Sequence, residues 1–196
     1  MASFIIILQV DAQNTFCPVL IVGNGMRILR LLFLIKRKIS GKVFTLLGIL
    51  TVGSYHKPLK INGFTVLTKN THLGRNTNFN GMRIQGGGRV DIGNNFHSGE
   101  NILVITRIHN YDEGAAIPYD GTYIMKSVTI EDNVWIGTRA ILLGGITIGE
   151  GAIIQAGAVV VSDIPAYAIA GGNPAKVFKY RDIEHYNRLK NERKYV

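Results

Sequence analysis

The stretch "VTIEDNVWIGTRAILLGGITIGEGAIIQAGAVVVSDI", residues 128–164, decides the fold because its aliphatic residues recur at an interval of six. Two series run through it in one phase, and each member of the second follows a member of the first by four residues. The first series is Ile130, Ile136, Leu142, Ile148, Ile154 and Val160. The second series, apolar and often small, is Val134, Ala140, Ile146, Ala152, Ala158 and Ile164.

A period of six fits neither an α-helix, with about 3.6 residues per turn, nor simple strand alternation. It fits a chain that turns a corner every six residues, so that three short strands complete a coil of 18 residues. The pattern therefore predicts an all-β solenoid, a triangular prism whose stacked coils pair as parallel strands around one core. The alternative, a sandwich of short strands, would place turns at irregular spacings of about 8–12 residues.

The same period is present upstream, with one irregularity. It slips by one residue near residues 86–88, which are three consecutive glycines, and we expect a bulge or a glycine corner to absorb the extra residue. The upstream positions are Ile61, Leu67, Leu73 and Phe79 before the slip, and Ile92, Ser98 and Val104 after it.

These repeats resemble the hexapeptide-repeat acyltransferases, and most closely the branch of maltose and galactoside acetyltransferases and polysaccharide O-acetyltransferases. The matching text is "VDIGNNFHSGENILVITRIH", residues 90–109, and the run from residue 128 to "GGNPAKVF" at 171–178. The resemblance covers about residues 61–180. It implies a left-handed parallel β-helix, against the usual right-handed crossover. It also implies acetyl-CoA as the acyl donor and a homotrimer whose clefts are shared between neighbouring subunits.

The repeat stops at His109, and residues 110–127 have no period, which predicts a loop that leaves the prism. The resemblance makes His109 the catalytic base that removes a proton from the acceptor hydroxyl. Imidazole suits this role because its pKa of about 6.5 leaves it neutral near pH 7. On periodicity alone, a solitary histidine at a loop edge is more often a surface side chain.

The resemblance also implies a set of donor-binding residues. The position of Trp135 lines the cleft in similar enzymes, although a lone exposed tryptophan is equally typical of an interface anchor. Thr138 and Ala156 match positions that bind the pantetheine arm, Ala156 through its backbone. Ser162 stands where the sugar acetyltransferases have a lysine. Lys176, with Lys179 or Arg181, matches positions that meet the nucleotide phosphates; the alternative is that these are solvated charges.

The candidate acceptor-binding residues are Asn78 and Asn80, in "RNTNFNG", and Asp112, which is expected to orient His109 or to contact the substrate. Asparagine is also a common corner residue. The other histidines, His56, His72, His97 and His185, show no spacing typical of a zinc site, so no metal is predicted.

Charge and cysteine content narrow the function classes. The formal net charge is +9, with eight Lys or Arg and no acid between Arg27 and Lys60, and seven Lys or Arg with three acids between Lys176 and Lys194. No nucleic-acid-binding motif accompanies this charge, so small anionic ligands, a membrane surface or an acidic polymer are the expected partners. The single Cys17 rules out an intramolecular disulfide and fits a reducing compartment, so we expect a cytoplasmic protein.

The two ends of the chain lie outside the repeats. Residues 1–60 form an apolar and basic segment, with Arg27, Arg30, Arg37 and Lys38 at roughly helical spacing, that either lies on the inner membrane face or caps the first coil. No run reaches the ~18 apolar residues of a membrane span. Residues 181–196 are predicted to be a polar helix that packs on the prism.

From these patterns and the resemblance we predict an acetyl-CoA-dependent O-acetyltransferase that acts on a carbohydrate hydroxyl, in a polysaccharide precursor or a lipid-linked saccharide. Direct transfer is expected, because Cys17 lies outside the repeats. The alternatives are N-acetylation of a nucleotide-linked amino sugar, acetylation of a drug, and a non-catalytic solenoid that serves binding or assembly.

Overall fold

The computed structural model describes residues 6–10, 16–20 and 39–196. It divides into two compact units, residues 1–39 and 40–196. In the first unit β1 (Ile6–Val10) and β2 (Phe16–Leu20) pair as antiparallel strands. This pair was not predicted, although both runs are rich in the apolar residues that favour strands. The basic positions Arg27, Arg30, Arg37 and Lys38 lie outside the described residues.

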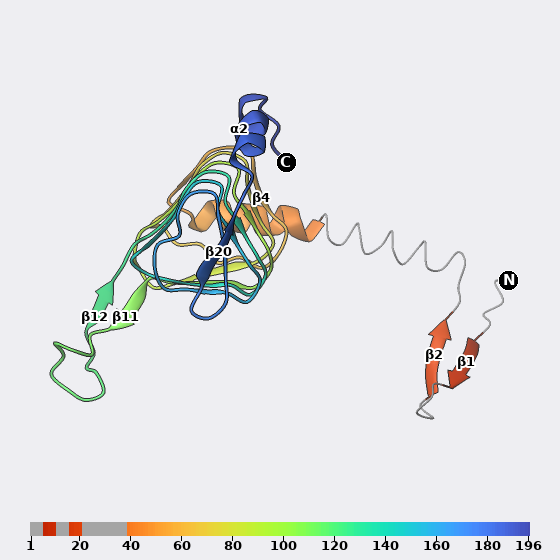
Figure 1. Ribbon diagram of the computed structural model, residues 1–196. Helices are drawn as coiled ribbons and strands as arrows, with labels where there is room; N and C mark the ends of the chain where they lie inside the picture. Colours follow the sequence, from red (N-terminus) through yellow and green to blue (C-terminus); the bar gives the residue numbers. More distant parts are fainter. Residues whose placement is uncertain (1–5, 11–15, 21–38) are drawn as a thin grey trace. The chain divides into compact units, whose positions relative to one another are not determined.

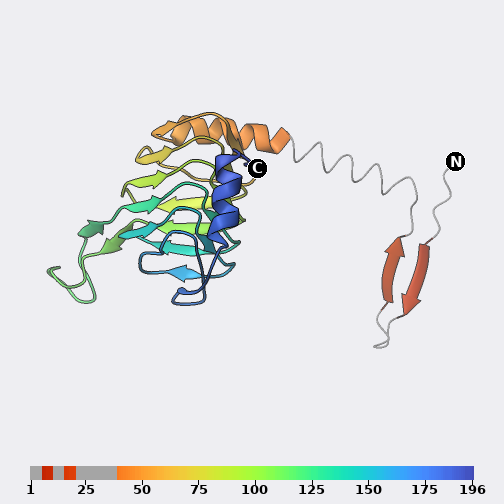
Figure 2. The ribbon, with the colours of Figure 1, turned by 45° about the horizontal axis from the view of Figure 1, so that its top comes forward.

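The second unit is a triangular solenoid, seen nearly end-on in Figure 1 and from the side in Figure 2. Its three walls, named face 1, face 2 and face 3 in chain order, are parallel sheets. Face 1 contains β3 (Ser54–Tyr55), β5 (Thr71–Leu73), β8 (Val90–Ile92), β13 (Val128–Ile130) and β16 (Ile146–Ile148). Face 2 contains β4 (Leu59–Ile61), β6 (Thr77–Phe79), β9 (His97–Ser98), β14 (Trp135–Ile136), β17 (Ile153–Ile154) and β19 (Ala168–Gly171). Face 3 contains β7 (Met82–Gln85), β10 (Ile102–Ile105), β15 (Ile141–Leu143) and β18 (Val159–Val160).

The edges of the prism are named corner 1–2, corner 2–3 and corner 3–1 after the faces that they join. Successive coils are in register at intervals of 18 residues in the regular part, where Ile130 pairs with Ile148. All twelve residues of the two series in 128–164 are at most 4% exposed, and so are the seven upstream positions. The predicted solenoid and its inward-facing residues are therefore confirmed.

The predicted slip consists of two opposite irregularities. Ile84 of β7 pairs with Val104 and occupies the inward position of its coil, only five residues after Phe79 and eight before Ile92. The longer step contains the three glycines. Gly86 has a φ of +102°, and a Cβ there would lie 2.6 Å from the Cβ of Arg107. Only glycine fits this turn, because a side chain would be both strained and in collision.

A helix over residues 39–51 lies across the first coil (Figure 2). Phe44 and Ile49 pack against the core, and Thr45 Oγ1 accepts a hydrogen bond from the Ile61 amide (2.9 Å). Gly48 is buried directly against Ile61: a Cβ at Gly48 would collide with the Ile61 side chain. This part of the N-terminal segment therefore covers the open end of the prism. No helix in the described part of the chain is long and apolar enough to cross a membrane.

The C-terminal helix α2 (Ile183–Asn191) packs on corner 1–2, as predicted, but is shorter than the predicted 181–196. Asp182 caps its N-terminus by accepting from the His185 amide (2.9 Å). Tyr186 packs edge-to-face against Tyr167, with ring centroids 5.0 Å apart. The Tyr186 hydroxyl donates a hydrogen bond to Glu150 Oε1 (3.0 Å), and Glu150 also forms an ion pair with Lys190. The last strand, β20 (Lys176–Tyr180), runs antiparallel to β19 and leads into this helix.

Candidate active site

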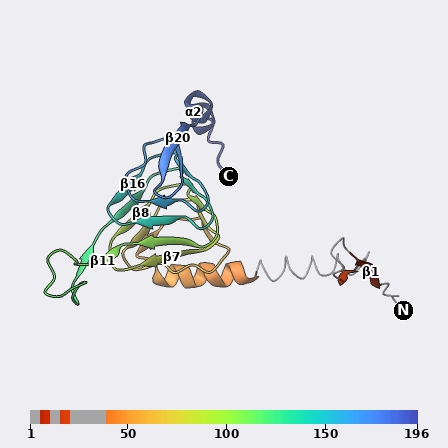
Figure 3. The ribbon, with the colours of Figure 1, turned by 60° about the horizontal axis from the view of Figure 1, so that its bottom comes forward.

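The regular coil opens at corner 3–1, where a hairpin leaves the prism (Figure 3). Its stem pairs β11 (Arg107–His109) with β12 (Tyr123–Met125) in antiparallel register. Thr106 anchors the base of the stem, because its buried hydroxyl donates to Gln85 O (3.0 Å) and accepts from the Gly88 amide (3.1 Å). The excursion therefore begins two residues before His109, so this histidine belongs to the hairpin stem and not to the last hexad of the coil.

His109 lies between two tyrosine rings of the same hairpin. Its imidazole stacks on Tyr119 with ring centroids 3.7 Å apart, and Tyr123, its cross-strand partner, lies at 4.5 Å. Nδ1 is buried without a hydrogen-bond partner in the described residues, whereas Nε2 is not buried. Stacking thus fixes the plane of the ring and leaves Nε2 as the nitrogen that can exchange a proton with a ligand.

The loop of the hairpin is ordered by Asp120. Its carboxylate accepts hydrogen bonds from the Thr122 hydroxyl and from the amides of Ala115 and Thr122, both at 2.8 Å. These donors, the Thr122 hydroxyl first, lower the pKa of Asp120 to about 2. Asp112, in contrast, is exposed, and no hydrogen bond or ion pair joins it to His109 within the described loop.

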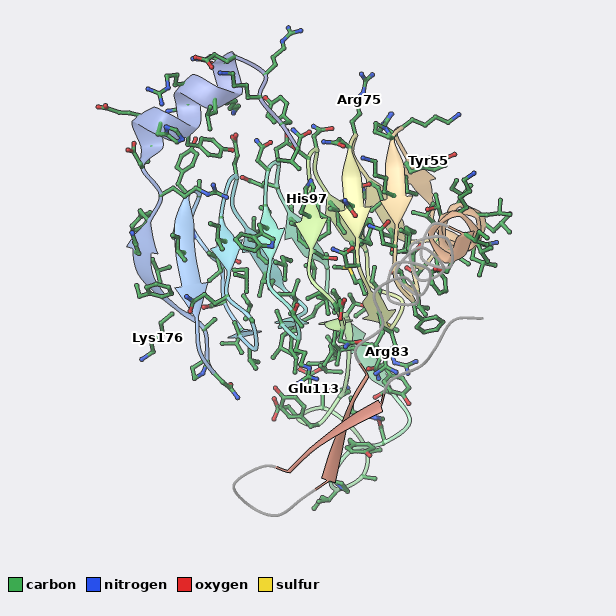
Figure 4. The ribbon with its side chains drawn as sticks, turned by 90° about the vertical axis from the view of Figure 1, so that its right-hand side faces the viewer. Tyr55, Arg75, Arg83, His97, Glu113 and Lys176 are labelled. Atoms are coloured by element: carbon green, nitrogen blue, oxygen red, sulfur yellow. The ribbon has the colours of Figure 1, made fainter. Side chains whose placement is uncertain are left out.

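Several of the expected donor-binding residues lie along corner 2–3. Thr138 and Ala156 are one coil apart there: Thr138 O accepts from the Gly157 amide at 2.9 Å, and Thr138 Oγ1 accepts from the Glu100 amide at 3.3 Å. Lys176 follows the last turn at the same edge, where the Ala175 amide donates to Val159 O (2.8 Å), and Figure 4 shows its side chain pointing away from the coil. A line of candidate contacts thus runs along one edge of the prism.

Asn78 and Asn80 belong to the same side, on face 2 and corner 2–3, but they form a structural ladder. Asn62 Nδ2 donates to Asn78 Oδ1 (2.9 Å) and to Asn80 Oδ1 (3.0 Å). Asn80 Nδ2 in turn donates to Ser98 O (2.8 Å) in the next coil. Their carboxamides therefore hold neighbouring coils together, as corner asparagines do.

Trp135 projects outward from face 2 and is 51% exposed. It borders a hollow of about 320 Å³ between face 2 and α2, to which His97, Tyr186 and Val196 also contribute. The chain after α2 folds back over this face, where Asn76 Nδ2 donates to Val196 O (2.9 Å). Burial is the largest cause of the raised pKa of Tyr186.

The remaining expected residues are placed apart from these. Ser162 is exposed on corner 3–1, the edge from which the His109 hairpin departs, and Lys179 is exposed on β20 opposite Ile169. In the described residues no three His, Cys, Asp or Glu side chains are close enough to hold a metal ion.

The repeating coil matches a known protein family. The family model described as "Bacterial transferase hexapeptide (six repeats)" matches residues 127–162. The chain carries the transferase hexapeptide repeat. This match covers the stretch in which the interval of six is most regular, and it confirms the resemblance found in the sequence.

One similar protein is named an acetyltransferase. A putative acetyltransferase of Schizosaccharomyces pombe is 46% identical over 87 residues, which are 44% of this chain and 41% of that protein. The chain thus aligns with less than half of that relative's length.

Two solved structures share the fold. A hexapeptide-repeat acetyltransferase of Vibrio cholerae complexed with acetyl-CoA is 27% identical with a TM-score of 0.57, covering 69% of this chain and 74% of that one. A maltose O-acetyltransferase of Clostridium difficile is 28% identical with a TM-score of 0.55, covering 76% of this chain and 89% of that one.

The hexapeptide-repeat pattern did not indicate the hairpin residues that surround His109. Tyr119 and Tyr123 stack on the imidazole, and Arg107 lies over the Tyr123 ring at 4.4 Å. Their only sequence signal is an aromatic-rich aperiodic loop. Asp120 had a clearer signal, because Asp-Gly at 120–121 is a typical turn sequence.

Proposed function

We propose that this protein is an acetyl-CoA-dependent O-acetyltransferase that acts on a carbohydrate hydroxyl. The observation that carries the proposal is His109, held between two tyrosine rings at the opening of the coil with Nε2 unburied. The relatives support the donor and the acceptor class: one solved hexapeptide-repeat acetyltransferase is a complex with acetyl-CoA, and another is named a maltose O-acetyltransferase.

The proposed reaction is direct transfer. His109 Nε2 takes the proton of the acceptor hydroxyl while the oxygen attacks the thioester carbonyl. The tetrahedral oxyanion is held by a backbone N–H, and its collapse breaks the C–S bond. The imidazolium returns the proton to the leaving thiolate, so the products are the acetyl ester and CoA. General base catalysis of this kind typically contributes about 10²–10⁴-fold.

Corner 2–3 is the proposed donor site. Thr138, Ala156 and Lys176 follow one another along this edge over successive coils. A long, thin ligand with an anionic end, such as acetyl-CoA, suits such a line of polar and backbone contacts that ends at a lysine. Lys179 is exposed on β20, whereas Arg181 lies at corner 1–2, where its Nε donates to Gly151 O (2.6 Å), so Lys176 is the cation of the proposed donor edge.

The base and this donor edge do not meet within one chain, which supports an assembly with shared clefts. His109 departs from corner 3–1, and face 3 separates that corner from corner 2–3. The four residues of β10 alone span about 13 Å at ~3.3 Å per residue. A second subunit that places its corner 2–3 beside the hairpin would complete the site.

Face 3 has the surface for such an assembly. In β10, β15 and β18 the outward side chains are aliphatic and largely only partly covered, whereas β7 presents Arg83 and Gln85 and face 1 presents polar residues such as Thr129 and Thr147. The outward aliphatic residues are Leu103, Ile105, Ile141, Leu143, Val159 and Val161. We propose that this face is buried in a homotrimer, as apolar patches of this kind mark interfaces. Light scattering of the purified protein is expected to give three times the chain mass, and a monomeric mass would contradict it.

The test of the activity measures thiol release from acetyl-CoA against a panel of sugars, amino sugars, nucleotide sugars and drugs that carry free hydroxyls or amines. We expect release with a carbohydrate hydroxyl, and at least a 100-fold loss in His109→Ala with an unchanged melting temperature. His56→Ala is the matched control, because His56 is exposed in the first coil, away from the hairpin.

Each other outcome has a defined meaning. Full activity in His109→Ala overturns the assignment of the base. Transfer only to amines identifies an N-acetyltransferase, and no thiol release with any acceptor favours the non-catalytic solenoid.

A further inference from the structure

The helix over residues 39–51 is apolar on two opposite faces, only one of which the prism covers. Phe44, Gly48 and Ile49 face the first coil. The side chains that point away are between 50% and 69% exposed, at the helical spacing of three, four and seven residues. They are Val43, Leu46, Leu47 and Leu50, which we call the cap face. A helix that is apolar all round is normally buried on all sides.

The described residues at the end of the prism that carries the cap face are cationic. Between residues 39 and 90 the chain has seven Lys or Arg and no Asp or Glu. In the described part, Lys42 in the helix and Lys57, Lys60 and Lys69 in the first coil are exposed. Figure 4 shows Arg75, in the second coil, pointing outward.

The ion pairs of the described residues all lie farther along the chain. They are Arg89–Asp91, Lys190–Glu150 and Lys194–Glu192. The positive charge at the cap end is therefore not neutralised by acidic side chains of this unit.

We propose that the cap face docks on the surface of a bilayer that contains anionic phospholipid. Leucine side chains enter the boundary between headgroups and acyl chains, and lysines beside them meet the anionic headgroups. A second copy of this chain is a poorer occupant of the cap face, because it would bring two cationic ends together. The absence of acidic residues around the patch is the feature that selects lipid.

The position of the helix makes this docking compatible with access to the candidate site. The helix lies across the end of the prism (Figure 2), so the coils stand away from the docked surface and leave the corners and the hairpin free. If the proposed trimer forms, cyclic symmetry directs its three cap faces the same way, and three weak contacts act together. Docking itself does not depend on the proposed acetyl transfer.

The experiment is co-sedimentation of the full chain with vesicles of phosphatidylcholine and phosphatidylglycerol in equal parts, or of phosphatidylcholine alone. We expect at least tenfold stronger binding to the anionic vesicles, weakened by raising NaCl from 0.1 to 0.5 M. The triple variant L46S/L47S/L50S is expected to lose at least tenfold in binding. The control is F178S, which removes an apolar side chain of similar exposure (57%) from β20 in the last coil.

A fluorophore sensitive to polarity reports which surface is buried. It is attached to Leu47→Cys, or to Phe178→Cys as the control, in a chain that also carries Cys17→Ser. Vesicles are expected to shift the emission to shorter wavelength at position 47 and not at position 178.

Three results would overturn the proposal. The first is no binding of the full chain to anionic vesicles. The second is equal binding by the triple variant and the wild type. The third is emission at position 47 that is already blue-shifted without lipid, which would mean that a second copy or residues 1–38 of this chain cover the cap face. Because none of these readouts uses acetyl transfer, failure here is distinct from failure of the proposed function.

Discussion

The coils and the hairpin that carries His109 differ in what holds them together. In the coils every strand of the regular part places an aliphatic side chain in a shared core, and these side chains are almost completely buried. In the hairpin three residue pairs form the stem, and β12 is exposed along its whole length. Ring stacking and the hydrogen bonds of Asp120 give the hairpin its order.

Because of this difference, the coils determine the stability of the fold, and the hairpin determines where the His109 imidazole lies. Changes in the coil core act on the whole solenoid, because each coil stacks on its neighbours. Changes in the hairpin act on the position of one imidazole and leave the core intact. The comparison therefore predicts large effects on folding from the coils and graded effects on activity from the hairpin.

The largest effect is expected for Ile148→Asp. Ile148 is completely buried, and an unpaired carboxylate there costs several kcal/mol of a total stability that is typically about 5–15 kcal/mol. We expect insoluble or unfolded protein, measured by soluble yield and circular dichroism.

The matched control for this change is Ile169→Asp. Ile169 points outward from face 2 and lies opposite Lys179 in the neighbouring strand. It is expected to fold with a small loss of stability. Equal melting of Ile148→Asp and the wild type would mean that the phase of the repeat is wrong.

An intermediate effect is expected for Tyr119→Leu, which removes the ring that stacks on His109 at 3.7 Å. Aromatic pairs contribute about 0.5–1.5 kcal/mol, which corresponds to a fall in kcat of up to about tenfold. KM and the melting temperature are expected to change little. Tyr119→Phe should restore kcat because the ring remains.

Tyr111→Leu is the control for this variant. Tyr111 is an exposed tyrosine of the same loop, and no ring contact in the described residues joins it to His109. If Tyr111→Leu and Tyr119→Leu lower kcat equally, the stack does not position the base.

The smallest effect concerns Asp120, whose pKa is lowered to about 2, with the Thr122 hydroxyl as the first cause. A lowered pKa means that the ionised form is favoured by the folded loop. The carboxylate therefore supports the loop at pH above the ordinary value of about 4, and this support is lost as the pH falls through about 2.

Thr122→Val removes the hydroxyl donor and is expected to move the pKa of Asp120 upward, toward its ordinary value. A pH titration of the carboxyl carbon by NMR measures the pKa in both proteins. An unchanged pKa in Thr122→Val would show that this hydrogen bond does not hold the loop.

The two helices of the second unit differ in how well their sequence patterns predict which side faces the core. The C-terminal residues are predicted to form a polar helix that packs on the prism, and Tyr186 of α2 does pack there. The helix over residues 39–51 has apolar residues on both sides, so its pattern alone does not say which side faces the core. The collision that a Cβ at Gly48 would make with Ile61 identifies the inner side in three dimensions.

For the expected site residues too, the sequence predicts some of the spatial relations and only the structure shows others. Thr138 and Ala156 share a corner because they lie 18 residues apart in a chain that repeats every 18, which the sequence alone can supply. Asn78 and Asn80 are predicted acceptor contacts, and the structure adds that Asn62, one coil earlier, donates a hydrogen bond to each of their carboxamide oxygens.

By itself the sequence determined the solenoid, its inward-facing residues and the place where the coil opens, because burial in a repeating coil depends on position along the chain alone. Tertiary structure decided that Tyr119 and Tyr123 enclose His109, that Asp120 and not Asp112 orders the loop, and that face 3 separates the base from the donor edge. These relations join residues across an aperiodic hairpin or between different edges of the prism. No periodicity encodes such contacts, because they depend on how the chain closes in space.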